Sequence, residues 1–350
     1  MIFFSIGLPS RFAEWCDAVT ARLVESRWGP VEICSIQMLD ELAVAAIRTK
    51  AAHLLARCRQ PVLRLQAEIV AAGRPFLVAL GDPQAALRDL LLQQVAEFAG
   101  ATRAVASSCA AMLTVTQAPG ALVLSSDRAA DPVAAAEAIA RHFEVGLCRD
   151  EIARLVADLA AAGVAPGQDE DRSWWDGLAE REQTVAAGAL QSYVSQFGGG
   201  AAGVIVWEPE LFYSTEAPTG QPPAAVSGPI DLTGRARFLV YGPYINLPPG
   251  AWSANVVVGF SSEAAEMSFV VEVVAGSQLA YTRVQPTGEQ VVEAALQFTI
   301  GNSVDRPVEI RIVNERAAFD GRLVFGYVTL TPRVGVREET EDALRRALRE

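Results

Sequence analysis

The chain has 350 residues, of which 51% are hydrophobic, so it is long and apolar enough to bury the cores of two domains. Its 41 acidic and 29 basic side chains give a formal net charge of −12, which argues against broad binding to nucleic acid or to an anionic membrane because both require a basic surface. The two histidines are too few for most metallohydrolase centres, and the five cysteines, odd in number and without a CxxC pair, predict neither a disulfide framework nor a zinc site.

Residues 1–163 predict an α/β domain. Here short apolar runs alternate with helical stretches rich in Ala and Leu, which is typical of a parallel sheet covered on both faces. The expected strands are the segments IFFSIGL, VEICSIQ, AHLLARC, PFLVALG and ALVLSSD. The N-terminus lacks the basic region of a signal peptide, and no apolar run is long enough to span a membrane, so we expect a cytoplasmic protein without direct membrane insertion.

The N-terminal segment has the layout of a phosphate-binding loop. A strand over residues 2–6, a tight turn over 7–9 and a helix that begins at Ser10 predict backbone N–H groups that point at an anion. The motif GxxxxGK[ST], which supplies the usual glycines, lysine and hydroxyl, is absent. Side chains that could converge on an anion in its place are Ser10, Arg11, Arg57, Arg59 and Arg88.

Residues 164–222 predict a linker region of loops and one helix. The segment EREQTVAAGALQSYVSQF is the expected helix, GGG marks a break, and VIVWEPELFYS predicts a strand before a passage rich in Pro and Gly. Trp174 and Trp175 lie in an acidic loop of this region. We interpret them as packing between domains or as a stacking surface for a sugar or a partner.

Residues 223–333 predict a β-sandwich of the jelly-roll type, because seven or eight short strands of alternating hydrophobicity follow one another with turn residues at close intervals. Residues 334–350 predict a C-terminal helix with Ala343, Leu344, Ala347 and Leu348 on one face. The expected fold is therefore an α/β domain followed by an all-β domain.

The β half also contains candidate glycan-binding residues. Flat aromatic rings with polar tips suit sugar stacking, and hydrogen-bonding groups near a strand end suit sugar hydroxyls. The candidates are Tyr241, Tyr244, Trp252, Arg311, Asn314 and Arg316. Strand alternation places Tyr241 and Tyr244 on opposite faces, so we expect only one of them in a given site. The segment resembles the noncatalytic β-sandwich modules, similar to carbohydrate-binding modules, that accompany polysaccharide-assembly proteins.

Four segments of the first half resemble, in order, the sulfotransferase family. FFSIGLPSRFAEW is similar to the strand, loop and helix that hold the phosphosulfate end of the donor 3′-phosphoadenosine-5′-phosphosulfate. AHLLARCRQP is similar to a strand that ends in Lys-Thr-His, and PFLVALGDPQAALRDLL to the strand and turn that bind the 3′-phosphate. ALVLSSDRAADPVAAAEAIARHFEVGLCRDEIARL is similar to the late strand and final helices. The resemblance implies a P-loop, sulfotransferase-like fold.

The chain departs from this family at the family's chemical positions. Phe12 lies in the loop where the family has small residues, and Gly81 stands for its phosphate-binding arginine. Arg59 stands where the family has its catalytic histidine, and a guanidinium stays protonated and cannot act as a base. His53 lies on the same strand, several residues upstream. We therefore expect no catalytic residue; in an active enzyme, His53 and Arg59 would be the candidates.

The leading hypothesis is a noncatalytic protein of bacterial surface-polysaccharide assembly. In it the β-sandwich binds a glycan or a partner, the sulfotransferase-like domain is a degenerate scaffold, and no cofactor or metal is bound. Two alternatives remain: an active carbohydrate sulfotransferase that uses 3′-phosphoadenosine-5′-phosphosulfate, and a structural assembly subunit without a small-molecule ligand. The expected partner is a polysaccharide or a polysaccharide-assembly protein, and the chain is a candidate homo-oligomer.

Overall fold

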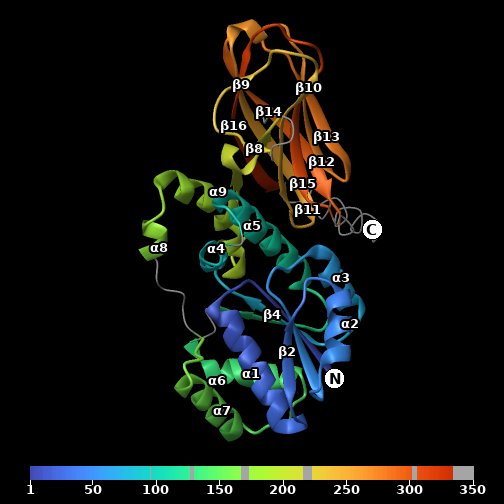
Figure 1. Ribbon diagram of the computed structural model, residues 1–350, viewed down its shortest axis with the longest axis vertical. Coiled ribbons are helices and arrows are strands. Elements are labelled where there is room, and N and C mark those ends of the chain that lie inside the picture. The colour runs from blue at the N-terminus through green and yellow to red at the C-terminus, as the bar shows by residue number, and fades with distance from the viewer. Residues whose placement is uncertain (95, 127–129, 167–172, 216–222, 302–305, 334–350) are drawn as a thin grey trace, which may run out of the picture. The chain divides into compact units, whose positions relative to one another are not determined.

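The computed structural model describes residues 1–94, 96–126, 130–166, 173–215, 223–301 and 306–333 (Figure 1). The chain divides into two compact units, Met1–Ala201 and Ala202–Glu350. The helix predicted over 334–350 lies outside the described residues. The predicted fold class, a parallel α/β domain followed by an all-β domain, is confirmed.

The first unit is built on a five-stranded parallel sheet with the strand order β2-β3-β1-β4-β5. Its strands are β1 (Ile2–Gly7), β2 (Val31–Ser35), β3 (His53–Cys58), β4 (Phe76–Leu80) and β5 (Ala121–Ser125). The central strands β1 and β4 are buried over almost their whole length, as expected for parallel strands covered on both faces. The carboxyl ends of β1, β3 and β4 therefore meet at one edge of the sheet, next to the loop that carries Ser10.

Nine helices are described in this unit. They are α1 (Arg11–Trp28), α2 (Leu39–Arg48), α3 (Leu63–Ala71), α4 (Pro83–Leu92), α5 (Phe98–Val115), α6 (Pro132–His142), α7 (Arg149–Ala161), α8 (Ser173–Asp176) and α9 (Glu180–Phe197). Helices α1, α6 and α7 share one core with the sheet face that carries Phe3 and Leu55. Helices α4 and α5 pack against α9, and α5 also packs against α3.

Among the described helices, α5 is the one that is long and apolar enough to cross a membrane by length and composition. Of its residues, 56% are buried, including Val105, Cys109 and Met112. Because these side chains pack within the first unit, α5 has the environment of a core helix.

The unit boundary differs from the predicted one. The first domain was expected to end at residue 163, but α9 packs on α4 and α5, so the compact unit continues to Ala201. The second unit begins before the predicted residue 223, because β6 (Ile205–Trp207) pairs with β16 (Arg322–Arg333). Trp174 and Trp175 lie in α8, half-buried, with their rings 5.6 Å apart and nearly perpendicular. Their predicted roles stay predictions.

The second unit contains two antiparallel sheets. One has the order β13-β12-β15-β10-β7-β8, and the other has the order β14-β11-β16-β6, with β9 added beside β16. The remaining strands are β7 (Tyr213–Ser214), β8 (Ala224–Ala225), β9 (Ile230–Asp231), β10 (Arg237–Ile245), β11 (Gly250–Phe260), β12 (Phe269–Ala275), β13 (Ser277–Val284), β14 (Gln290–Ile300) and β15 (Val308–Asn314). From β10 to β16 each connection changes sheet, except the one between β12 and β13, which is the connectivity of a jelly roll.

The segment VIVWEPELFYS, predicted as one strand, joins the two sheets. It forms β6 in one sheet and β7 in the other, with a 3-10 turn (Pro209–Leu211) between them. Pro209 has no N–H to donate to a ladder, which ends the strand at Trp207. Trp207 and Phe212 are fully buried on the two sides of this turn, with ring centroids 6.5 Å apart. This corner therefore belongs to the core of the sandwich.

Replacing Trp207 by Ala tests this assignment. We expect the second unit to lose about 3–5 kcal/mol of stability, because a fully buried ring leaves a large cavity. Hydrogen exchange should accelerate at the amides of β16 and not at those of β1. Trp174→Ala is the control, since its ring is only half-buried. Faster exchange confined to α9 would assign the segment to the first unit instead.

Candidate functional site

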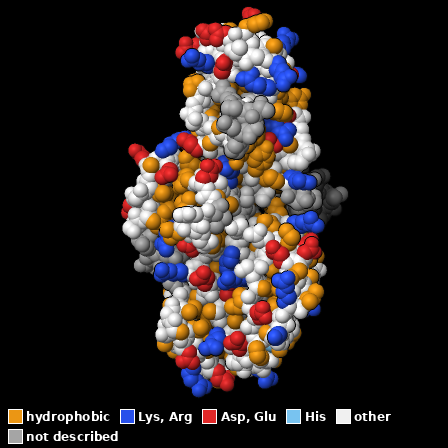
Figure 2. All heavy atoms as spheres, viewed as in Figure 1, with side chains coloured by type: hydrophobic (Ala, Val, Ile, Leu, Met, Phe, Trp, Pro, Cys, Tyr) orange, Lys and Arg blue, Asp and Glu red, His pale blue; other side chains and the backbone are white. Residues whose placement is uncertain are grey.

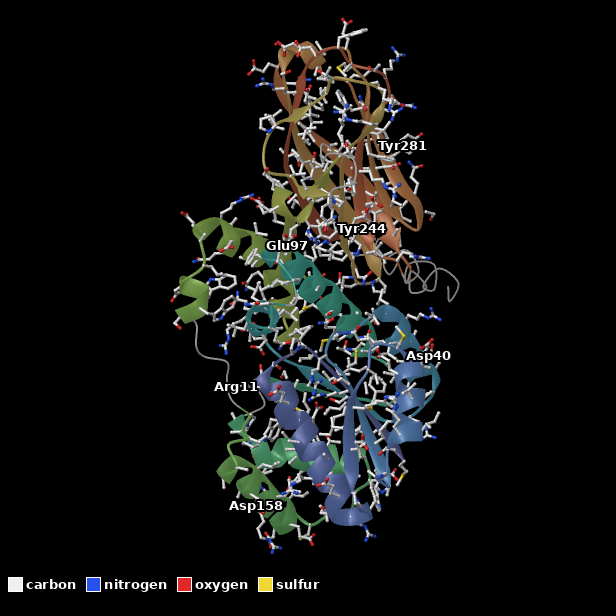
Figure 3. The ribbon with its side chains drawn as sticks, viewed as in Figure 1. Arg11, Asp40, Glu97, Asp158, Tyr244 and Tyr281 are labelled. Atoms are coloured by element: carbon white, nitrogen blue, oxygen red, sulfur yellow. The ribbon has the colours of Figure 1, made fainter. Side chains whose placement is uncertain are left out.

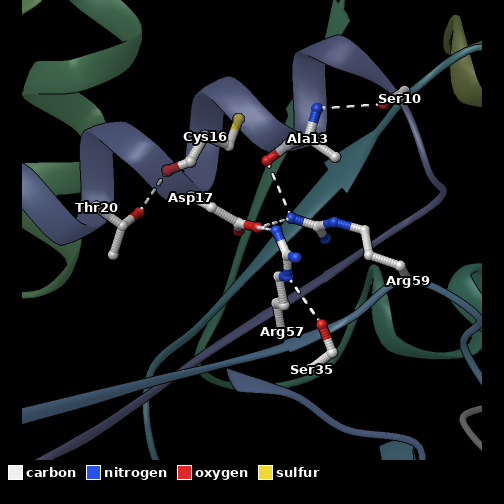
Figure 4. A network of polar contacts seen from close by, with 8 residues as sticks. All are labelled: Ser10, Ala13, Cys16, Asp17, Thr20, Ser35, Arg57 and Arg59. Atoms are coloured by element: carbon white, nitrogen blue, oxygen red, sulfur yellow. Dashed lines mark hydrogen bonds and ion pairs between the residues drawn. The ribbon is translucent and has the colours of Figure 1, made fainter. Parts of the chain in front are cut away.

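The loop between β1 and α1 is closed by its own hydrogen bonds. Ser10 is 2% exposed, and its hydroxyl accepts a hydrogen bond of 3.1 Å from the backbone N–H of Ala13 (Figure 4). This is an ordinary N-cap, which satisfies a helix N–H that a bound anion would otherwise meet. A Cβ at Gly81 would lie 2.5 Å from the Ser10 hydroxyl. Packing therefore requires a glycine at position 81.

A buried acid below this loop takes up two of the predicted anion ligands. Asp17, on α1, is 1% exposed and forms an ion pair with Arg59 and a longer one, 3.9 Å, with Arg57 (Figure 4). Arg59 also donates to the carbonyl of Ala13 over 3.0 Å, and Arg57 donates to the Ser35 hydroxyl over 3.0 Å. Both guanidinium groups are thus turned toward α1 and its carboxylate.

The other candidates in this half lie apart. Arg11 is exposed at the start of α1 (Figure 3), and Phe12 beside it is buried. Arg88, on α4, lies 3.8 Å from the carboxylate of Asp89. The loop therefore offers a capped helix start and a bulky buried ring. Arg57, Arg59 and Arg88 each form an ion pair with an acid, whereas Arg11 is exposed. These residues do not fit a nucleotide phosphosulfate donor.

Both histidines have structural partners. His53 begins β3, at the opposite end of the sheet from Ser10, and its Nε2 lies 3.1 Å from the Trp28 carbonyl and its Nδ1 3.3 Å from the N-terminal amine. His142 Nε2 lies 3.1 Å from the Phe76 carbonyl, and burial lowers the pKa of His142. Among the described residues, no group of three or more His, Cys, Asp or Glu could hold a metal ion.

In the second unit, three tyrosines gather on the solvent face of the six-stranded sheet. The ring centroids lie 5.6 Å apart for Tyr213 and Tyr241, 6.3 Å for Tyr213 and Tyr244, and 6.3 Å for Tyr241 and Tyr244. Tyr244 is 42% exposed (Figure 3), and the other two are half-buried. We call these three residues the tyrosine cluster.

The prediction that Tyr241 and Tyr244 lie on opposite faces is wrong. The pairing of β10 with β15 shifts register between Phe238 and Val240 and again between Pro243 and Ile245. Each shift inserts an extra residue, so positions 238, 241 and 244 come to share the outer face. Tyr244 adopts a left-handed backbone conformation, with φ of 62°, at the second shift. Two bulges therefore assemble the cluster.

Charged side chains continue this surface. Glu309 accepts hydrogen bonds from the Tyr244 hydroxyl, 3.1 Å, and from Arg311 Nη2, 2.6 Å. Arg311 Nη1 lies 3.5 Å from Glu272, and its guanidinium lies 5.5 Å from the centre of the Phe238 ring. One guanidinium is thus held between two carboxylates at the border of the tyrosine cluster.

Strand register aligns these residues in one row across the sheet. Tyr213 is opposite Tyr241, Tyr241 is opposite Arg311, Arg311 is opposite Glu272, and Glu272 is opposite Tyr281. Tyr281 is 58% exposed (Figure 3). The row runs perpendicular to the strands and has aromatic rings at both ends.

The other predicted glycan ligands lie elsewhere. Trp252 is 4% exposed in the core face of β11, in the other sheet, and donates to the Pro248 carbonyl over 3.1 Å. Asn314 is fully buried, accepts from the Arg237 N–H over 2.6 Å and donates to the Arg316 carbonyl. Arg316 is exposed just after β15. The structure brings together only Tyr241, Tyr244 and Arg311.

Sequence reasoning missed the other members of this surface, which are Tyr213, Phe238, Glu272, Tyr281 and Glu309. Strand alternation could have shown that Glu309 and Arg311, two residues apart on β15, share a face. The other members could not be found from the sequence, because they join this surface through the pairing of strands that are distant in sequence. On the face of the molecule in Figure 2, basic and acidic side chains are interspersed without a continuous basic area.

No family model and no curated protein sequence matches the chain. Similar solved structures include TmCBM61 in complex with β-1,4-galactotriose, at 13% identity over 37% of this chain and 88% of that chain, with a TM-score of 0.24. The CBM36-1 domain of a xylanase from the hindgut metagenome of Trinervitermes trinervoides has 9% identity over 38% and 99%, with a TM-score of 0.25. The C-terminal CBM6 of LamC from Zobellia galactanivorans has 14% identity over 37% and 98%, with a TM-score of 0.23. Likenesses at these TM-scores do not identify a ligand.

Asp17→Asn tests the buried ion pair. The amide leaves the Arg59 guanidinium without its counter-charge, so we expect the free energy of unfolding of the first unit to fall by about 3 kcal/mol, at the low end for a broken buried pair because Arg57 is partly exposed. Urea denaturation measures the change. Glu14→Gln, on the exposed side of the same helix, is the matched control and should cost little. Equal stability of the two variants would contradict this account.

The raised pKa of Tyr244, in the tyrosine cluster, makes the stability of the second unit depend on pH. Burial, followed by the charge of Glu309, raises the pKa of Tyr244 from 10.0 to about 12. Because the folded-state pKa is raised, the contribution of this phenol to stability is complete below pH 10 and is lost as the pH rises through 12. Glu309→Gln should lower the pKa of Tyr244, measured as the tyrosinate absorbance that Tyr244→Phe removes. An unchanged pKa in Glu309→Gln would show that the carboxylate does not act on the phenol.

Proposed function

We propose that the outer face of the six-stranded sheet binds a carbohydrate chain. The observation that carries this proposal is the tyrosine cluster, in which three rings with polar hydroxyls share one solvent face. Aromatic rings stack on the apolar faces of sugars, and the hydroxyls, carboxylates and guanidinium beside them suit sugar hydroxyl groups. Trp252 and Asn314, which are buried, have no place in this site.

The row of side chains sets the direction of the ligand. From Tyr213 to Tyr281 it crosses five neighbouring strands, which at about 4.8 Å for each of four steps corresponds to roughly 19 Å. A single sugar ring would cover one end only. The proposed ligand is therefore an oligosaccharide that lies across the strands, with the tyrosine cluster as its principal platform and Tyr281 as the distal one.

The charges of the site favour a neutral glycan. Glu272 and Glu309 bring two negative charges, and Arg311 between them brings one positive charge. The guanidinium is already satisfied by carboxylates, and the excess negative charge would repel a uronate or a sulfate group. An uncharged chain meets no such repulsion, and its hydroxyls can donate to the carboxylates.

We further propose that the first unit is a noncatalytic scaffold and that the protein acts in surface-polysaccharide assembly in the bacterial cytoplasm. Its support is chemical: two arginines at the predicted donor positions, Arg57 and Arg59, form ion pairs with Asp17, and Ser10 caps its own helix. The sulfotransferase resemblance then describes a framework. The glycan site does not depend on that framework, because all its residues belong to the second unit.

Tyr241→Ala should weaken binding of both short and long neutral oligosaccharides about tenfold, which is roughly 1.4 kcal/mol, because it removes the central ring of the site. Tyr281→Ala should weaken only the long ones. Isothermal titration calorimetry against a length series of neutral β-linked oligosaccharides measures both. Phe319→Ala, which removes a ring that is 99% exposed outside the row, is the control and should change neither affinity.

Two outcomes would contradict the proposal. Equal affinity of Tyr241→Ala and the parent protein, with both folded, would exclude the tyrosine cluster as the site. Tight binding of 3′-phosphoadenosine-5′-phosphate that is lost in Arg11→Ala would instead support the sulfotransferase alternative.

A further inference from the structure

One backbone edge of the first unit's sheet is open. In the strand order β2-β3-β1-β4-β5, β2 is terminal and pairs only with β3 within the described chain. The Pro30 carbonyl accepts from the His53 N–H, and the Ile36 N–H donates to the Arg57 carbonyl, so the even-numbered backbone groups face β3. Those of Val31, Ile33 and Ser35 consequently point outward. An exposed strand edge of this kind is a template for another strand.

The helix next to this edge is hardly covered. Leu42 is the only buried residue of α2. Val44 is 46% exposed and Ile47 is 85% exposed, and Ile33 on β2 is 41% exposed. The opposite sheet edge, β5, carries no large exposed hydrophobic side chain among its residues. Apolar surface is therefore concentrated beside the β2 edge, where it marks an interaction site.

Helix α2 has acidic side chains at its start and basic ones at its end, so its charges complement those of a second, antiparallel copy of α2. Asp40 (Figure 3) and Glu41 lie in its first turn and Arg48 in its last turn, with Lys50 just beyond. Two such helices related by a two-fold axis place the acidic turn of each beside the basic turn of the other. A parallel arrangement would place like charges together.

We propose that a second copy of this chain docks on β2 and α2 through a two-fold axis at Ile33. The two β2 strands pair antiparallel and join both sheets into one. Ile33 meets the partner's Ile33, and Val31 meets the partner's Ser35, so every outward backbone group finds a partner. Glu32, the one charged residue of β2, meets the partner's Cys34 and not its own copy. Both copies of α2 lie on the same face of the joined sheet.

The strongest test uses this register. Glu32 and the partner's Cys34 form a pair without mutual backbone hydrogen bonds, in which Cα atoms approach to about 4.5 Å, a distance that suits a disulfide. In a Cys148→Ser background, which removes the exposed thiol, the full chain with Glu32→Cys should form a covalent dimer on mild oxidation. Adding Cys34→Ser should abolish it. Cross-linking that survives Cys34→Ser would overturn the proposed register.

Sedimentation of the full chain supplies the second test. The parent protein should be a dimer, and Ile47→Arg should raise the dissociation constant at least tenfold because it buries a charge in the interface. Leu92→Arg, at the exposed end of α4, is the matched control and should leave the dimer intact. A monomeric parent protein would overturn the proposal. So would a dimer that Ile47→Arg leaves unchanged but that is lost when residues 334–350 are removed, since the C-terminal segment would then hold the copies together.

Discussion

A buried carboxylate organises the carboxyl edge of the first unit's sheet. Burying Asp17 is costly unless cations accompany it. Arg57 on β3 and Arg59 just after it supply those cations. Both guanidinium groups thereby lie beside α1, and that of Arg59 also lies beside Gly7 at the end of β1. Asp17, Arg57 and Arg59 thus form one internal ion-pair network. This edge of the sheet is a packed joint between the end of β3 and α1.

In the second unit, the exposed tyrosines of β10 lie where its pairing with β15 is irregular. A regular β10 would distribute Phe238, Tyr241 and Tyr244 over both faces, and the rings in the core face would have to compete with aliphatic side chains for space. Two register shifts bring all three to the solvent side. The same shifts place Tyr244 within hydrogen-bonding distance of Glu309, which links the tyrosine cluster to the charged centre of the row. Bulges of this kind often aim side chains at a site.

The two proposals concern separate units and separate surfaces. The proposed glycan site is a row of side chains on a sheet face of the sandwich, whereas the β2 edge offers backbone groups and an apolar helix. A dimer would present two glycan rows in one assembly, so a polysaccharide that reaches both would gain avidity without any new contact. A negative result for glycan binding would leave the dimer proposal standing, and a negative result for the dimer would leave the glycan proposal standing.

The sequence by itself determined the fold class of both halves, because hydrophobic periodicity and turn residues report directly on strands and helices. Their chemistry also made Tyr241, Tyr244 and Arg311 candidates, and the structure brings these three together. Local patterns could not show that Asp17 neutralises Arg57 and Arg59, since these residues meet only when α1 packs on β3. Nor could strict alternation anticipate the bulges in β10, which depend on pairing with a strand some seventy residues later. The tertiary structure alone decided which candidate side chains share one solvent face, because pairing and register bring together residues that the sequence keeps apart.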